Sequence, residues 1–228
     1  MNEDRFRFEN DDLDFPIYDK NPYVPKWGWV VLFITMPIGL LLALSPKIPI
    51  AILSCLVVLI PLLYFLKWDI KAIYQKPRLK DVGIAVLLFA GYMIYSLALM
   101  TVLEQFGIVG GNLVGESTVT VMTMLPMVFT LMTEELIKFI PFMFFLRVGY
   151  KYSHNRKRSV VVAMLLVMAF FATLHAFNFN MLIFALFIQG LGSIFEFIGY
   201  IKTKNILISY ITHLCTDVFI FTIVLLGL

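Results

Sequence analysis

Residues 48–66 read IPIAILSCLVVLIPLLYFL, nineteen consecutive residues without one charged side chain. A helix needs about 20 predominantly apolar residues to cross the ~30 Å hydrocarbon core of a bilayer. Six further stretches are as apolar or nearly so, and they run over residues 27–45, 82–103, 119–146, 159–177, 181–201 and 205–226. We therefore predict an all-α fold, a polytopic transmembrane bundle of about seven spans.

Composition and charge placement support this prediction. Of the 228 residues, 61% are hydrophobic, more than a soluble domain of this size can bury. Sixteen of the 18 lysines and arginines precede the first span or lie in alternate loops, so they gather on one side. The positive-inside rule then places the N-terminus in the cytoplasm and the C-terminus outside. The net charge of +3 is thus a topology signal, and we expect a bilayer as partner and no nucleic acid.

Two segments follow from this pattern. Residues 1–26 form an acidic-leaning cytoplasmic tail whose prolines argue against a long helix. Residues 27–228 form a single transmembrane helical domain. No internal repeat is visible in it, which disfavours an inverted-repeat transporter.

Ionisable residues inside the apolar stretches are the main clue to function, because such side chains are costly in hydrocarbon. The span over 119–146 contains Glu134, Glu135 and Lys138. Glu134 and Lys138 are four residues apart and share a helix face, so we expect them to pair. A structural ion pair needs only one carboxylate, however. Two adjacent carboxylates push their pKa values apart, which suits a base in proton transfer.

Imidazoles lie in two other spans. His175 lies near the end of the span over 159–177, and Asn178 could orient its ring. The plainer explanation for a lone histidine is a packing role. His213 and Asp217 share one face of the last span, and a hydrogen bond between helices is their plainer explanation. Glu196, in the span over 181–201, lies at a shallower depth and either faces the same cavity or a basic headgroup region.

Depth unites these residues. At ~1.5 Å per residue, Glu134, His175, His213 and Asp217 all fall near the middle of the bilayer. Ionisable groups at that depth face a protein interior or water. We therefore predict that the four residues surround one cavity, with Lys138 beside Glu134.

The order and spacing of these motifs also resemble a known family. Glu134-Glu135, Phe171-x-x-x-His175 and His213-x-x-x-Asp217 are similar to the three motifs of the CAAX-processing and bacteriocin-immunity proteases, over roughly residues 118–224. The chain departs from the family at Phe139, where an arginine is usual and where Lys138 is the nearest base. The Glu-Glu-x-x-Lys pattern is also similar to the PrsW-like intramembrane proteases, whose later motifs fit less well.

The resemblance implies an intramembrane endopeptidase of a bacterial cell membrane, acting on a membrane-associated peptide or protein. It implies that Glu134, aided by Glu135 and His175, activates water and that His213 and Asp217 stabilise the oxyanion, with Lys138 and Asn178 in support. A metal-dependent version would use Glu134, His175 and His213 as zinc ligands. The alternative is a membrane scaffold or bacteriocin-immunity factor that binds a partner membrane protein and cleaves nothing.

Overall fold

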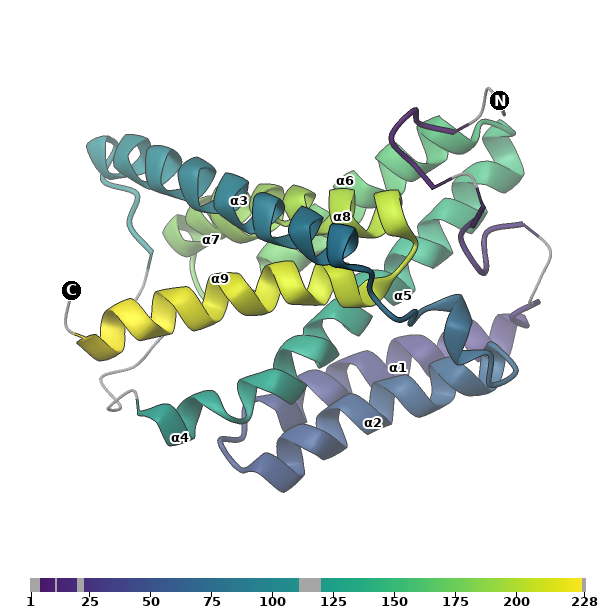
Figure 1. The fold of residues 1–228 in the computed structure, drawn as a ribbon, viewed down its shortest axis with the longest axis horizontal. Coiled ribbons are helices and arrows are strands. Elements are labelled where there is room, and N and C mark those ends of the chain that lie inside the picture. Colours follow the sequence, from purple (N-terminus) through teal and green to yellow (C-terminus); the bar gives the residue numbers. More distant parts are fainter. Residues whose placement is uncertain (1–4, 11, 20–22, 111–119, 227–228) are drawn as a thin grey trace.

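The protein is all-helical, as predicted. The computed structural model describes residues 5–10, 12–19, 23–110 and 120–226, and no strand occurs within them. Its longer helices are α1 (Lys26–Ala43), α2 (Ile48–Phe65), α3 (Leu79–Gln105), α5 (Met127–Ser153), α6 (Arg156–Leu174) and α9 (Ile206–Leu226). They pack as a bundle, with the N-terminal tail and the end of α9 at opposite ends (Figure 1).

Shorter elements complete the bundle. The segment from Phe179 to Thr203 is built of α7 (Phe179–Ala185), a π-helical turn η2 (Leu186–Gly190), a 3₁₀ turn η3 (Leu191–Ser193) and α8 (Ile194–Thr203). A 3₁₀ turn η1 (Ile70–Ala72) precedes α3, and α4 (Val121–Met124) precedes α5. Within the described residues, six helical segments are long and apolar enough to cross a membrane: α1, α2, α3, α6, the segment from Phe179 to Thr203, and α9. They confirm an integral membrane protein. The seventh long helix, α5, carries the ionisable residues that lower its hydropathy.

The boundaries differ from the prediction in two places that affect the site. The predicted span over 119–146 begins with residue 119, outside the described residues, and the helix then breaks before α5, whose N-cap is Pro126. Helix α6 ends at Leu174, so His175 is its C-cap rather than part of its last turn.

The span from Phe179 to Thr203 changes helical type halfway. A Cβ on Gly190 would lie 2.8 Å from the carbonyl oxygen of Met168 in α6, so only glycine permits this close approach. π-helical turns often occur at functional sites. The change of helical type sets the rotation of α8 and therefore the direction in which Glu196 points.

The loops that we predicted on one side do lie together. At the end of the bundle where α2 ends and α9 begins, Ile206 N donates to the carbonyl oxygen of Ile73, and Asn205 Nδ2 donates to that of Gln75. Arg147 Nη1, near the end of α5, donates to the carbonyl oxygen of Ile17 at 2.7 Å. The basic loops and the tail thus share one end of the molecule, opposite the C-terminus (Figure 1).

The orientation of this end in the membrane stays a prediction. We expect the basic end to face the cytoplasm and the C-terminus to face the opposite side of the membrane. A reporter fused after Leu228 should therefore be active only if it is a type that functions on the extracytoplasmic side. Alkaline phosphatase and green fluorescent protein, fused in turn, measure this. A fluorescent C-terminal fusion without phosphatase activity would contradict the N-in, C-out topology.

The polar tail is more closely tied to the bundle than its composition suggests. Arg156, at the start of α6, donates to both carboxylate oxygens of Glu9, at 2.8 and 2.6 Å, and to Asp14. Lys204 Nζ, between α8 and α9, lies 2.5 Å from Glu9 Oε2. The Glu9 side chain is fully buried. We call Glu9, Asp14, Arg156 and Lys204 the tail cluster; it joins the tail to α6 and to the end of α8.

Replacing Glu9 by Gln should destabilise the protein by about 3 kcal/mol near neutral pH, because it leaves Arg156 and Lys204 short of a buried counter-charge. Burial would raise the pKa of Glu9, but hydrogen bonds from Arg156 and Lys204 lower it to about 2. The folded pKa lies below the unfolded one, so this stabilisation is present above about pH 4.5. It is lost as the pH falls towards 2.

Denaturant unfolding of both proteins in detergent, across this pH range, measures the effect. The difference in unfolding free energy should shrink as the pH falls. Asp12→Asn, at an exposed position of the same tail, is the matched control and should change stability by no more than about 0.5 kcal/mol. Equal stability of Glu9→Gln and the wild type at neutral pH would refute a role for the cluster.

Candidate functional site

Helix α5 supplies three of the predicted site residues within little more than one turn. Glu135 and Lys138 are buried, with 3% and 4% of their side chains exposed, whereas Glu134 retains 22%. Lys138 Nζ lies 2.5 Å from Glu135 Oε1. The predicted pairing of Lys138 with Glu134 is therefore wrong. Spacings of three and four residues both bring side chains together on a helix, and here burial selects the pair that points inward.

Helix α8 adds a carboxylate to this pair. The ammonium of Lys138 also contacts Glu196 Oε2, so it lies between two buried carboxylates from different helices. Ser209, in the first turn of α9, donates to Glu135 Oε2. The ammonium also lies 4.7 Å from the centre of the Phe171 ring of α6. We call Glu135, Lys138, Glu196 and Ser209 the inner network; it connects α5, α8 and α9.

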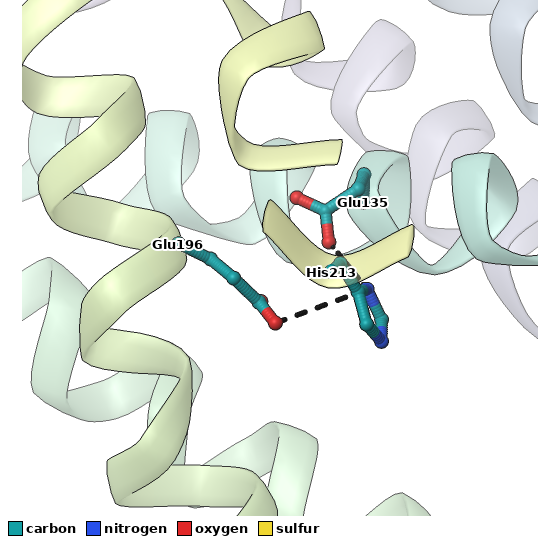
Figure 2. A group of neighbouring side chains, drawn as sticks. All are labelled: Glu135, Glu196 and His213. Carbon is teal, nitrogen blue, oxygen red and sulfur yellow. Dashed lines mark hydrogen bonds and ion pairs between the residues drawn. The ribbon is translucent and has the colours of Figure 1, made fainter. Parts of the chain in front are cut away.

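His213 of α9 stands at the edge of the inner network and has two different sides. Its Nδ1 lies 2.8 Å from Glu135 Oε1 and 3.9 Å from Glu196 Oε1. Figure 2 shows the ring beside both carboxylates. Its Nε2 lies 3.9 Å from Glu134 Oε2 and 3.9 Å from Asp217 Oδ2. The inner network thus holds the ring through one nitrogen, and the other nitrogen faces two carboxylates that are partly exposed.

We call Glu134, Asp217 and the Nε2 side of His213 the outer site. Asp217 retains 27% exposure of its side chain. The outer site therefore contains both partly exposed carboxylates of the predicted cluster.

His175 lies beside the outer site but is held by its own helix. Its Nδ1 lies 3.0 Å from the carbonyl oxygen of Phe171, and the two rings are 4.6 Å apart between centres. Phe171 in turn lies edge-on to His213, with ring centres 6.5 Å apart. Within the described residues Asn178 makes no hydrogen bond to His175; it caps α7 by accepting from Met181 N. Asn178 therefore does not orient His175 here.

Two groups of side chains near His213 contain residue types that can bind a metal. Glu135, Glu196 and His213 offer ligand atoms within 4.8 Å of one another, but the Lys138 ammonium lies between the two carboxylates and already supplies their positive charge. In the outer site, bonds of about 2.1 Å to a tetrahedral zinc would place ligand atoms about 3.4 Å apart. The separations of 3.9 Å from His213 Nε2 are longer than that. The predicted zinc set of Glu134, His175 and His213 stays a prediction, because its separation between Glu134 and His213 is only about 0.5 Å longer than that spacing.

The same separations suit a water molecule. A water oxygen about 2.8 Å from both Nε2 and Glu134 Oε2, an ordinary hydrogen-bond length, would bond to them at an angle of roughly 90°. A cavity of about 20 Å³ also adjoins the inner network, lined in part by Glu135, Glu196 and Ser209. It has room for one water.

Two residues beside the site were not among its predicted members. Glu196 was expected to face either the same cavity or a basic headgroup region, and it lies in the inner network. Its charge in an apolar span is a signal in itself. Tyr92 of α3 gave no signal, because a tyrosine in a membrane helix is common. Its ring lies against Gly192 and Phe195. It therefore packs a side chain of a fourth helix against the start of α8 and the turn before it.

Comparison with protein-family models, with curated proteins and with solved structures found no match to this chain.

Proposed function

We propose that the protein is an intramembrane endopeptidase that hydrolyses a peptide bond of a membrane-associated peptide or protein with an activated water. One observation carries the proposal: His213 is fixed through Nδ1 by the inner network and presents Nε2 to two accessible carboxylates. A fixed imidazole beside a carboxylate is a common arrangement for acid–base catalysis. The family resemblance of the motifs supports the same reaction, and a bacterial cell membrane belongs to the proposal on that ground.

The chemistry assigns a role to each residue. Glu134 accepts a proton from water as the water oxygen bonds to the carbonyl carbon of the substrate. His213, protonated at Nε2, donates to the carbonyl oxygen as negative charge develops on it. The bond between carbon and nitrogen then breaks, and the proton on Glu134 passes to the departing amine. Asp217 keeps His213 oriented, and His175 lies beside it in support.

The inner network holds His213 in a fixed position for this reaction. Glu135 holds the imidazole, and Lys138 compensates the charges of Glu135 and Glu196. Preorganised charges are most effective where water is excluded. Lys138 therefore acts by positioning Glu135, which is a different role from pairing with Glu134.

The alternative function is a scaffold or immunity factor that binds a partner membrane protein. The observation in its favour is that Lys138 forms ion pairs with both carboxylates while the network joins three helices, as a purely structural network would. Polar contacts of this kind stabilise helix association in membranes. The two functions differ in what they require of Glu134.

A comparison of membrane peptides separates them. Cells producing the wild type should contain cleavage products that are missing from cells producing Glu134→Gln, because glutamine keeps the shape but cannot accept the proton. Glu104→Gln, at an exposed position near the end of α3, is the matched control and should keep the products. Identical peptide sets for wild type and Glu134→Gln, with equal protein levels, would favour the scaffold.

A further inference from the structure

A second site lies away from the ionisable residues, on the outer side of α1. A groove of about 620 Å³ is lined by residues of α1 and by Phe144 of α5. This volume lies within the range of about 300–1,000 Å³ that is common for ligand sites. Its α1 residues are Lys26, Trp29, Val30, Phe33, Ile34, Pro37 and Ile38.

Packed aromatic rings and one stripe of α1 residues define the shape of the groove. Phe144 is held between Trp29 and Phe33, with ring centres 5.2 Å from each. Lys26, Val30, Ile34 and Ile38 follow one another at intervals of four residues and form one stripe along α1. Val30, Ile34 and Ile38 expose between 44% and 57% of their surface. An apolar floor and an exposed apolar wall thus run along the helix.

Charge is confined to one end. Within the described residues, Lys26 is the only charged side chain that lines the groove, and it is the first residue of α1. Arg147 follows Phe144 by three residues and lies over the ring of Tyr23, 5.4 Å from its centre. Arg147 donates hydrogen bonds to the carbonyl oxygens of Ile17 and Asp19. These acceptors are neutral groups and do not cancel its positive charge. The charged end of the groove is therefore cationic.

The length of the groove selects its occupant. From residue 26 to residue 38 a helix rises about 18 Å at ~1.5 Å per residue. Half of a ~30 Å hydrocarbon core is about 15 Å, so the groove spans one leaflet. An acyl chain of a phospholipid likewise extends through one leaflet. We propose that the groove binds an acyl chain of an anionic phospholipid, with the lipid phosphate held by Lys26.

This site is independent of the proposed hydrolysis. Basic residues beside membrane helices attract anionic lipids, and each contributes a factor of about five in binding. Lys26 at the mouth of an apolar groove adds selection of the headgroup to burial of the chain. Trp27, also exposed at this end, suits the headgroup level where aromatic rings concentrate.

Trp29 gives a direct readout, because it lines the groove. In the full-length protein carrying Trp27→Phe and Trp68→Phe, Trp29 is the only tryptophan. Reconstituted into phosphatidylcholine vesicles, its fluorescence should be quenched by brominated phosphatidylglycerol about fivefold more strongly, at equal mole fraction, than by brominated phosphatidylcholine. Lys26→Gln should abolish this preference and Lys26→Arg should keep it.

The control is Lys47→Gln, which removes a basic residue at the opposite end of α1 and should leave the preference unchanged. Equal quenching by the two lipids in the wild type would overturn the proposal in favour of ordinary boundary lipid. So would equal loss of preference in Lys26→Gln and Lys47→Gln. A third outcome would also overturn the proposal. If neither lipid quenches Trp29 and the protein sediments as a dimer, the occupant of the groove is a second copy of the chain.

Discussion

Replacing Lys138 by Met is expected to destabilise the protein by about 3–5 kcal/mol, because it leaves two buried carboxylates without their shared cation. Lys138 contacts both Glu135 and Glu196, and 4% of its side chain is exposed. Methionine fills a similar volume, so the loss comes from charge rather than from a cavity. Denaturant unfolding in detergent measures the change in free energy.

Lys151→Met is the matched control, because Lys151 lies on the same helix in an exposed position. It should change the unfolding free energy by no more than about 0.5 kcal/mol. Adding Glu135→Gln and Glu196→Gln to Lys138→Met removes the uncompensated charges and should recover part of the stability. Equal stability of Lys138→Met and Lys151→Met would contradict the inner network.

Replacing His213 by Gln should lower peptide hydrolysis by about 10²–10⁴-fold, the usual contribution of an acid–base group. Glutamine can still bond to Glu135, so the folded protein should persist, but it carries no proton to the substrate. Product peptides measured by mass spectrometry at equal protein levels give the rate. His154→Asn is the matched control, because His154 is exposed at the left-handed C-cap of α5 and asparagine tolerates that conformation. Unchanged product formation in His213→Gln would remove His213 from the mechanism.

The helical bundle was predictable because its signal is local. Uninterrupted apolar stretches such as residues 48–66 need no knowledge of their neighbours, and α2 (Ile48–Phe65) ends within one residue of the predicted span. The gathering of the basic loops at one end followed from the charge of those loops alone. The helix boundaries around His175 were less accurate, because a cap depends on local backbone geometry rather than on hydropathy.

The predicted cluster could be recognised because ionisable residues in apolar helices are expensive, and three helices carried them to similar depths. Glu134, His213 and Asp217 do meet, and His175 lies beside them. What the sequence could not give was the pairing within the cluster. Whether Lys138 turns to Glu134 or to Glu135 depends on which face of α5 is covered by α8 and α9.

Long-range pairs were beyond prediction for a related reason. Glu9 binds Arg156 and Lys204, which lie 147 and 195 residues further along the chain. The composition of an acidic tail does not indicate which of its carboxylates will be buried. Glu196 could not be assigned to the site because the sequence does not show which face of α8 packs against α5. In both cases the missing information is tertiary.

The central claim is that water activated at Glu134 and His213 cuts a peptide bond in the membrane. Membranes from cells producing the wild type or Glu134→Gln, incubated in heavy-oxygen water, test it most directly by mass spectrometry of the peptides formed. The claim predicts peptides whose new C-terminal carboxylate contains one heavy oxygen in the wild type and that do not form with Glu134→Gln. The same labelled peptides in equal amounts from both proteins would contradict it.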